Sequence, residues 1–351
     1  MYRNITVKGD AFECGRMYGK LTADLIHKNI KMYLLLFEFH SGLDKKRALY
    51  IAKSYEKIIQ DHDENIYKEM VGIAEGANVS FDEILLLNTR TELLSNVTMG
   101  ECTSFAIQPK ATSDNSLWLC QNWDWFNLTN GLSVLLKICQ SGKPEITMFV
   151  EAGHVGKMGF NNYGIGLCVN KLHHKTQGIG IPFIVLCRAI LNCDQLSDAI
   201  NEIYRYPIAT SGNFLIVNKN GIVVDFEVTH DDVDFIEPQR GIIVHTNRFE
   251  SLRLRQFDKG VRSNGGDSIV RKQFVFNVLD EKNGHIDLNL IKSIQRDRSN
   301  GFNSICMSSN ESNPEQARWI TQAGIIMNFT SKKLYITFGQ PINNEYEVFD
   351  M

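Results

Sequence analysis

The stretch that separates two kinds of sequence pattern in this chain reads GECTSFAI, residues 100–107. It places Cys102 at the head of an apolar segment that predicts a β-strand over residues 103–107. Residues 1–100, by contrast, lack strand alternation and repeat apolar side chains near helical spacing, as Leu21, Leu25 and Ile26 do. The change of pattern therefore falls directly before a cysteine. If the peptide bond before Cys102 were cut, this cysteine would become a chain terminus.

Before this boundary we expect helices, and after it a mixture of strands and helices. A capping box, SFDE at 80–83, predicts a helix over residues 80–94. The later strands are expected at 117–121, 133–138, 146–150, 165–169, 214–217, 222–228, 241–246, 320–329 and 334–338. Helices are expected after Pro182, after Asp194, and at 268–279 and 288–297. Runs of strands separated by runs of helices predict an α+β layered fold.

The composition excludes several classes of protein. The chain has 351 residues, 43% hydrophobic and 22% charged, with a net charge of −3 from 37 basic and 40 acidic residues. This is an ordinary globular composition, and the absence of any long basic run argues against nucleic-acid binding. No apolar stretch approaches the roughly 20 residues of a membrane span, and no signal-peptide core follows Met1. We therefore expect a cytoplasmic protein without a membrane or nucleic-acid partner.

The histidines and the 8 cysteines give no sign of a metal site. No Cys-x-x-Cys pair is present, which argues against a zinc ribbon, a redox dithiol or a small disulfide scaffold. His173 and His174 are adjacent, so that on a strand they would point to opposite faces. No Gly-x-Gly-x-x-Gly loop or Walker motif indicates a nucleotide cofactor. We expect neither a metal nor a bound cofactor.

Short blocks of sequence along nearly the whole chain occur in the order found in one known family. Gly9, Glu13, Gly15 and Gly19 come first, and the later blocks are GIAEG at 72–76, LNTRTEL at 87–93, CTS at 102–104, QNWDW at 121–125, EAG at 151–153, GKMGFN at 156–161, HTN at 245–247 and SIC at 304–306. In these blocks the chain resembles the isopenicillin N acyltransferase (acyl-coenzyme A:6-aminopenicillanic acid acyltransferase) family of autoproteolytic N-terminal-nucleophile hydrolases. One block alone could be accidental, whereas this ordered series is a strong signal.

The resemblance implies a four-layer αββα fold and a precursor that cuts itself between Glu101 and Cys102. Residues 1–101 would then form a helical precursor segment, retained as a small subunit, and residues 102–351 the catalytic subunit. A free α-amine titrates near pH 8 and can accept the thiol proton within the same residue, so that no histidine base is needed. The family often has glycine where Glu101 stands. Association into a further homo-oligomer stays open.

Three other site residues follow from the resemblance. Asp124, in the QNWDW block, would hold the α-amine of Cys102 and tune its pKa. Asn247, after an apolar strand, would donate to the oxyanion. Arg318 would orient Asp124 or the amine through a charge-assisted hydrogen bond. The alternatives to these roles are a turn former for Asp124, a loop cap for Asn247 and an exposed helix-end or loop arginine for Arg318.

The function expected from these residues is acyl transfer through a Cys102 thioester. The substrate would be an N-acyl amide or an acyl thioester, with acyl-coenzyme A as one possible donor and water or an amine as acceptor. Ala317 stands where the penicillin enzyme has a serine, so the use of penicillin-type substrates stays open. Two alternatives remain: an unprocessed hydrolase that pairs Cys102 with His245, and an inactive homologue that acts as a binding protein.

Overall fold

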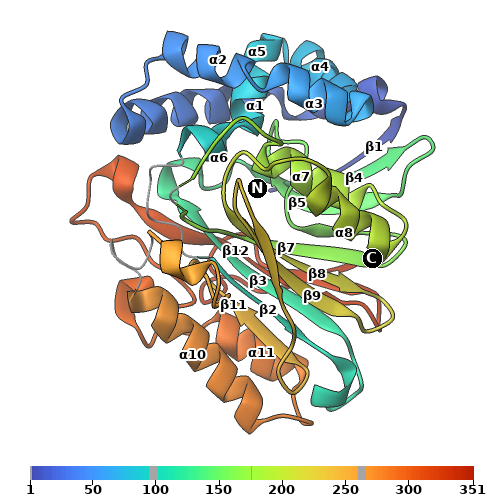
Figure 1. Ribbon diagram of the computed structural model, residues 1–351, viewed down its shortest axis with the longest axis vertical. Coiled ribbons are helices and arrows are strands. Elements are labelled where there is room, and N and C mark those ends of the chain that lie inside the picture. Colours follow the sequence, from blue (N-terminus) through green and yellow to red (C-terminus); the bar gives the residue numbers. More distant parts are fainter. Residues whose placement is uncertain (1, 95–101, 175, 260–265) are drawn as a thin grey trace.

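Two β-sheets packed face to face between layers of helices form the body of the protein (Figure 1). The computed structural model describes residues 2–94, 102–174, 176–259 and 266–351. The side chain of Gln121, in one sheet, donates to the carbonyl oxygen of Val169 in the other at 2.6 Å, so the facing surfaces of the sheets are in contact. The predicted αββα layering is confirmed.

The first sheet has eight strands in the order β1-β4-β5-β6-β7-β8-β9-β10. Their bounds are β1 Arg3–Gly9, β4 Ser133–Gln140, β5 Ile146–Glu151, β6 Gly159–Asn161, β7 Ile165–Lys171, β8 Gly212–Asn218, β9 Val223–Val228 and β10 Val233–Ile236. All neighbouring strands are antiparallel except β1 and β4, which run parallel.

The second sheet has six antiparallel strands in the order β11-β2-β3-β12-β13-β14. Their bounds are β2 Thr103–Ile107, β3 Trp118–Phe126, β11 Ile242–His245, β12 Trp319–Asn328, β13 Lys333–Ile336 and β14 Glu347–Asp350. Strand β2 begins directly after Cys102, as the sequence predicts, and lies between β11 and β3. Residues from both neighbours of β2 can therefore reach the head of that strand.

Helices of the N-terminal segment gather at one end of the sandwich (Figure 1). They are α1 Ala11–Ser41, α2 Lys45–Lys53, α3 Glu56–His62, α4 Glu64–Ala77, α5 Phe81–Asn88 and α6 Arg90–Leu93. Helices α1 and α4 touch backbone to backbone: a Cβ atom on Gly15 would lie 2.0 Å from the carbonyl oxygen of Glu69, and one on Gly72 would lie 2.2 Å from that of Phe12. The early glycine blocks of the sequence thus serve helix packing.

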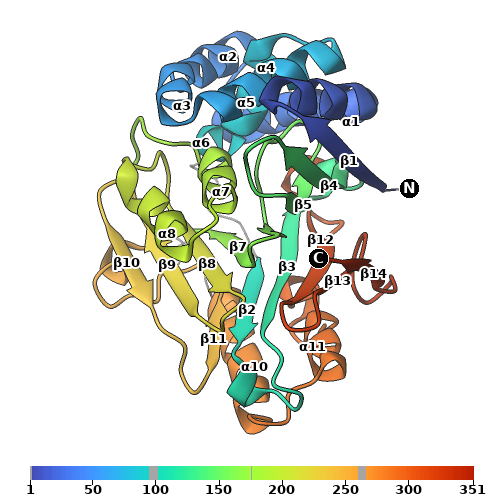
Figure 2. The same ribbon diagram turned by 90° about the vertical axis from the view of Figure 1, so that its right-hand side faces the viewer.

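Further helices cover the outer faces of both sheets. Helices α7 Phe183–Leu191 and α8 Leu196–Arg205 lie over the eight-stranded sheet (Figure 2), where Phe183 packs on Phe214 with ring centres 5.0 Å apart. Helices α10 Gly266–Glu281 and α11 Leu288–Gln295 cover the six-stranded sheet. Buried side chains on the two sides of that contact include Val275 and Ile291 from the helices and Phe105 and Val244 from the strands.

Some elements differ from the expectations. Residues 1–100 are not entirely helical, because Arg3–Gly9 forms β1, whose Ile5 and Val7 alternate inward and pair with β4. The helix expected at 80–94 is divided at Thr89 into α5 and α6. Strands β6, β10 and β14 were not expected. They have only three or four residues each, too few for a visible alternation.

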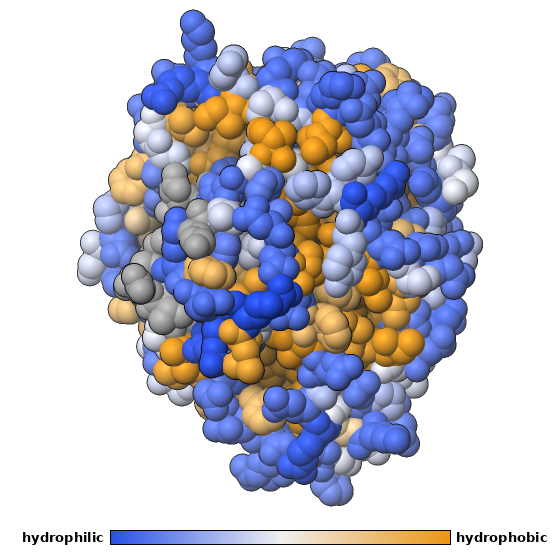
Figure 3. All heavy atoms as spheres, in the orientation of Figure 1, coloured by the Kyte–Doolittle hydropathy of each residue, from blue (hydrophilic) through white to orange (hydrophobic). Residues whose placement is uncertain are grey.

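The surface mixes polar and apolar side chains. Figure 3 shows apolar side chains gathered over the middle of one face, between the N-terminal helices and α10. Across the ranges that the structure describes, no helix combines the length and the apolar composition needed to cross a membrane.

Candidate active site

Cys102 lies buried at the head of β2, next to the QNWDW block on β3. Its thiol donates a hydrogen bond to the carbonyl oxygen of Asp124 at 3.6 Å. Burial raises the pKa of the Cys102 thiol to about 11, so that the thiol is protonated at neutral pH. The other side of the expected cleavage site, Glu101, lies outside the described residues.

Two side chains hold the carbonyl oxygen of Cys102. Asn170, at the end of β7, donates to it at 3.0 Å, and Arg271, on α10, donates at 2.9 Å. Arg271 also donates to the hydroxyl of Thr103 at 2.8 Å, while Asn170 accepts from the hydroxyl of Ser104 at 2.5 Å. The CTS block is thus fixed from the opposite sheet and from the helical layer at once.

Asp124 is fully buried on β3 and only half satisfied. One carboxylate oxygen accepts from the hydroxyl of Thr321 on β12 at 2.5 Å, and the other has no hydrogen-bond partner among the residues that the structure describes. Burial holds the pKa of Asp124 well above its usual value, although the Thr321 hydrogen bond and the charge of Arg271 oppose the shift. Such a carboxyl can exchange a proton or bind a nearby cation.

Thr321 is itself positioned by Met307, the residue that follows the SIC block. Its hydroxyl accepts from the amide of Met307 at 2.7 Å, so its own proton is directed to Asp124. Within the block, the carbonyl oxygen of Ile305 accepts from the side chain of Asn122 at 2.8 Å. The block at 304–306 therefore supports the QNWDW strand through backbone groups.

Asn247 lies at the end of β11 and shares Arg271 with Cys102. Its side-chain amide donates to the carbonyl oxygen of Lys171 at 3.0 Å, and its side-chain oxygen accepts from Arg271 at 3.3 Å. Its backbone amide donates to the hydroxyl of Ser268 at 3.0 Å. An asparagine amide has two N–H bonds, so one remains for a substrate oxygen. The structure brings Cys102, Asp124 and Asn247 into one neighbourhood.

His245 is buried, and both of its ring nitrogens contact acceptors. Nε2 lies 2.7 Å from a carboxylate oxygen of Glu227, and Nδ1 lies 2.7 Å from the carbonyl oxygen of Thr246. Burial lowers the pKa of His245, but the carboxylates Asp225 and Glu227 outweigh it and raise that pKa to about 9. His245 is therefore a protonated donor to both acceptors, which does not suit a base for Cys102.

Arg318 does not occupy the position expected of it. Its guanidinium donates to Glu311, with the closest contact at 2.5 Å, and to the carbonyl oxygen of Asn313 at 2.9 Å. None of its hydrogen bonds within the described residues reaches Asp124. The arginine that does contact the Cys102 neighbourhood is Arg271. Arg318 precedes β12, and the loop before that strand directs its side chain outward to Glu311.

The sequence interpretation did not identify Asn170, Arg271 or Thr321. Arg271 had a visible signal, since it lies on the inward face of its helix together with Ser268, Val275 and Leu279, at spacings of three and four residues. A charged residue in such a stripe needs a buried partner. Asn170 and Thr321 carry no such signal, because their roles depend on contacts between distant strands.

A buried ion cluster next to this site joins four of the sequence blocks. Glu151 binds Arg90 and Lys157, both at 2.8 Å, and also accepts from Tyr33. The Lys157 ammonium lies 3.8 Å from the centre of the Trp123 ring. Despite burial, the charges of Arg90 and Lys157 hold the pKa of Glu151 well below its usual value. The positive charge of Lys157 in turn favours a thiolate at Cys102.

The described residues contain no group of three or more His, Cys, Asp or Glu side chains arranged to hold a metal ion. The polar groups around Cys102 are amide, hydroxyl, guanidinium and carboxyl groups from β3, β7, β12 and α10. Such a set suits proton transfer and stabilisation of an oxyanion.

Comparisons with known proteins agree with the sequence blocks. The family model for acyl-coenzyme A:6-aminopenicillanic acid acyl-transferase matches residues 111–343, a range that begins after Cys102 and includes Asp124, Asn247 and Arg318. A relative from Emericella nidulans, acyl-coenzyme A:6-aminopenicillanic-acid-acyltransferase 40 kDa form, is 27% identical over 353 residues, which covers 99% of this chain and 95% of the relative.

Solved structures show a more distant likeness. A variant of conjugated bile acid hydrolase from Clostridium perfringens is 13% identical, with a TM-score of 0.49 over 71% of this chain and 92% of the other. Penicillin V acylase from Agrobacterium tumefaciens is 12% identical, with a TM-score of 0.49 over 71% of this chain and 86% of the other. On the strength of the family-model match, which spans well over half of its length, the chain belongs to the acyl-coenzyme A:6-aminopenicillanic acid acyl-transferase family.

Proposed function

We propose that this protein is a self-processing N-terminal-nucleophile enzyme that transfers or hydrolyses acyl groups through a thioester on Cys102. The observation that carries the proposal is the surroundings of Cys102. The residue heads a strand, its carbonyl oxygen is held by Asn170 and Arg271, and the half-satisfied carboxyl of Asp124 lies on the neighbouring strand.

The first step is cleavage of the chain. The Cys102 sulfur attacks the carbonyl carbon of residue 101, the carbon–nitrogen bond between residues 101 and 102 breaks, and the nitrogen takes up the thiol proton. Water then hydrolyses the resulting thioester, which leaves a carboxylate on one fragment and a free thiol on the other. Cys102 gains an α-amine in this way.

The new α-amine activates the thiol for later turnovers. In the uncut chain the thiol is protonated at neutral pH, because burial raises its pKa to about 11. An α-amine titrates near pH 8 and accepts the proton from within the same residue. The Asp124 oxygen that has no partner in the described residues is available to the resulting ammonium. A charge there also lowers the pKa of the thiol.

Acyl transfer then follows the same chemistry as cleavage. The thiolate attacks an acyl carbon, the bond from that carbon to the leaving nitrogen or sulfur breaks, and the leaving group takes the proton held by the α-amine. Asn247 supplies the N–H group for the oxyanion. Water or an amine then attacks the Cys102 thioester. The substrates are N-acyl amides or acyl thioesters, with acyl-coenzyme A as one donor.

The small fragment stays bound after cleavage, in our proposal, because buried ion pairs join it to the large one. Glu69 on α4 binds Arg188 on α7 through two hydrogen bonds of 2.9 and 2.7 Å. Arg90 on α6 binds Glu151 on β5. A partial separation that left either charge buried without its partner would cost about 3–5 kcal/mol. The β1–β4 pairing adds backbone hydrogen bonds across the same junction.

Intact mass spectrometry of purified protein tests the proposal. We expect two chains, one ending at Glu101 and one beginning at Cys102, and an acylated large chain when an acyl thioester is added. Cys102→Ala should give one uncut chain that is never acylated. Cys139→Ala, which changes a cysteine elsewhere, should behave as the wild type.

Each rival has its own result in the same experiment. A single wild-type chain with thiol-dependent activity would favour an unprocessed hydrolase, and a single chain that is never acylated would favour a binding protein. A Cys102→Ala protein that still splits at residue 102 would remove the nucleophile assignment altogether.

A further inference from the structure

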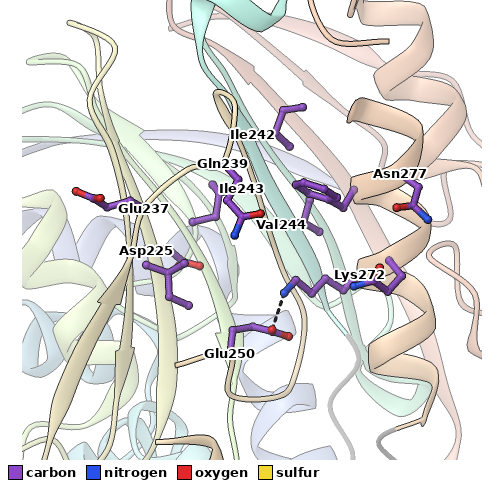
Figure 4. Close-up of a pocket in the computed structure, with 12 residues that line it drawn as sticks. Asp225, Glu237, Gln239, Ile242, Ile243, Val244, Glu250, Lys272 and Asn277 are labelled. Carbon is purple, nitrogen blue, oxygen red and sulfur yellow. Dashed lines mark ion pairs between the residues drawn. The ribbon is translucent and has the colours of Figure 1, made fainter. Parts of the chain in front are cut away.

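A cavity of about 200 Å³ lies at the edge of the sandwich, between strands β9, β10 and β11 and helix α10 (Figure 4). Strand β11 is the edge strand of the six-stranded sheet, so the cavity opens where that sheet ends. Its lining includes Asp225, Ile243, Val244, Glu250, Lys272 and Phe276. Figure 4 shows Asp225 and Lys272 on opposite sides, with Ile243 and Val244 between them.

This cavity is separate from the candidate active site. Val244 and Ile242 of β11 pair with Phe105 and Ile107 of β2. Cys102 lies directly before the first residue of β2. Strand geometry of about 3.3 Å per residue puts the paired positions roughly 10–16 Å from Cys102. The two sites nevertheless share a helix, since Arg271 contacts Cys102 and the adjacent Lys272 lines the cavity.

One buried carboxylate oxygen in the cavity wall lacks a partner. Asp225 is fully buried and accepts from the side-chain amide of Asn213 through one oxygen, while its other oxygen has no hydrogen-bond partner in the described ranges. Glu250, by contrast, is paired with two cations, Lys272 at 2.5 Å and Arg248 at 3.1 Å. A buried acceptor without a partner has lost its hydrogen bond to water, so a donor placed on Asp225 is favoured.

The other charged groups nearby are paired or negative, and protonated His245, which is bonded to Glu227, also attracts Asp225. Glu227 accepts from His245 and from the backbone amides of Glu250 and Ser251, at 2.7, 2.5 and 2.9 Å. Glu237, at the rim, adds a further negative charge. A cation is therefore favoured over an anion. The apolar wall formed by Ile243, Val244 and Phe276 favours an organic group over a bare metal ion.

We propose that this cavity is a second, non-catalytic binding site for a small organic ammonium ion. The ammonium group donates to Asp225, and the apolar part lies against Ile243, Val244 and Phe276. At roughly 30 Å³ per water molecule, the cavity has room for about seven waters or for an organic molecule of similar volume. A one-ring amine fits these limits.

Calorimetric titration with benzylammonium tests the site. We expect saturable binding to the wild type, with affinity at least 10-fold lower for benzyl alcohol, which has the same ring without the charge. Asp225→Asn should weaken benzylammonium binding at least 10-fold. Asp231→Asn, the same change at an exposed carboxylate outside the cavity, should leave it unchanged. Equal affinity of wild type and folded Asp225→Asn would overturn the proposal.

A second measurement covers the case in which Asp225→Asn does not fold. Crystals of the wild type soaked in 4-bromobenzylammonium should show anomalous bromine density between β11 and α10. Density only beside Cys102 would overturn the second site and leave the acyl-transfer proposal intact, since an amine there is a possible acyl acceptor. Absence of saturable binding in solution together with absence of bromine density would also overturn it.

Discussion

Two fully buried acidic groups close to β2 differ in how completely they are bonded. Glu227 accepts three hydrogen bonds, from His245 and two backbone amides, and His245 uses both of its ring nitrogens. Asp124 accepts one hydrogen bond, from Thr321, and its second oxygen has no partner within the described residues. Each group is equally hidden from water.

This difference indicates a structural role for the Glu227–His245 pair and a chemical role for Asp124 and Cys102. In the Glu227 pair every donor and acceptor is matched, so adding or removing a proton breaks a buried bond. The Asp124 carboxyl and the protonated Cys102 thiol each make one hydrogen bond, so a change of protonation state breaks few bonds. Burial raises the pKa of both groups. Strongly perturbed pKa values of buried groups cluster at functional sites.

Asp124→Asn should therefore have the largest effect on turnover among the variants that spare Cys102. We expect turnover to fall on the order of 10³-fold, because the amide cannot hold the α-ammonium of Cys102. The melting temperature should stay the same or rise, since a costly buried carboxyl is removed. Steady-state kinetics and thermal denaturation measure both.

The matched change in the Glu227–His245 pair is Glu227→Gln. It should lower the melting temperature and change turnover far less, because it leaves protonated His245 with a weaker partner. If Glu227→Gln instead lost turnover while Asp124→Asn kept it, Glu227 would belong to the catalytic site and Asp124 would have the structural role.

Asn247→Ala should lower turnover by about 100-fold or more, because only the transition state loses a donor. The change should appear in kcat, with KM little altered. The residue also links Arg271 to the backbone of Lys171, so thermal denaturation is needed to show that the variant is folded. Unchanged kcat with a raised KM would place Asn247 in ground-state binding.

Arg271→Lys should slow turnover by about 10-fold, since the compact lysine ammonium lacks the planar fork of donors with which Arg271 reaches Cys102, Thr103 and Asn247. The control is Arg318→Lys, at the position that the sequence favoured. Its partners are Glu311 and Asn313, so turnover should change less than about twofold. A large loss in Arg318→Lys alone would restore the original assignment.

The layered fold and the position of Cys102 could be predicted because both depend on local pattern. The change from helical to strand-like sequence and the residues 103–107 of β2 are visible in short windows. Strand β1 was missed because its parallel partner lies about 130 residues later in the chain, at Val134. A seven-residue segment before a long helix gives little evidence of such a pairing.

The candidate site also contains residues that the sequence could reveal and residues that it could not. Cys102, Asp124 and Asn247 stand in recognisable blocks, whereas the role of Thr321 depends on the pairing of β12 with β3. The resemblance favoured Arg318, whose hydrogen bonds go to Glu311 and Asn313, whereas Arg271 is the arginine bonded to Cys102. Burial on a helix face was the better physical signal for Arg271.

His245→Gln should have the smallest effect on turnover and a clear effect on stability. The pKa of His245 is raised from 6.5 to about 9 in the folded protein. The protonated form therefore stabilises the fold, fully below pH 6.5, and this contribution is lost as the pH rises through 9. The difference amounts to at most about 3 kcal/mol, at 1.36 kcal/mol for each unit of pKa.

Chemical denaturation of both proteins from pH 6 to 9.5 measures this contribution. The stability advantage of the wild type over His245→Gln should shrink as the pH rises. Over the same range, the acidic limb of kcat/KM should persist in His245→Gln, because the α-amine of Cys102 and not an imidazole takes the proton. A folded and cleaved His245→Gln protein that has lost this limb would make His245 the base. The Glu227–His245 pair would then belong to the catalytic site.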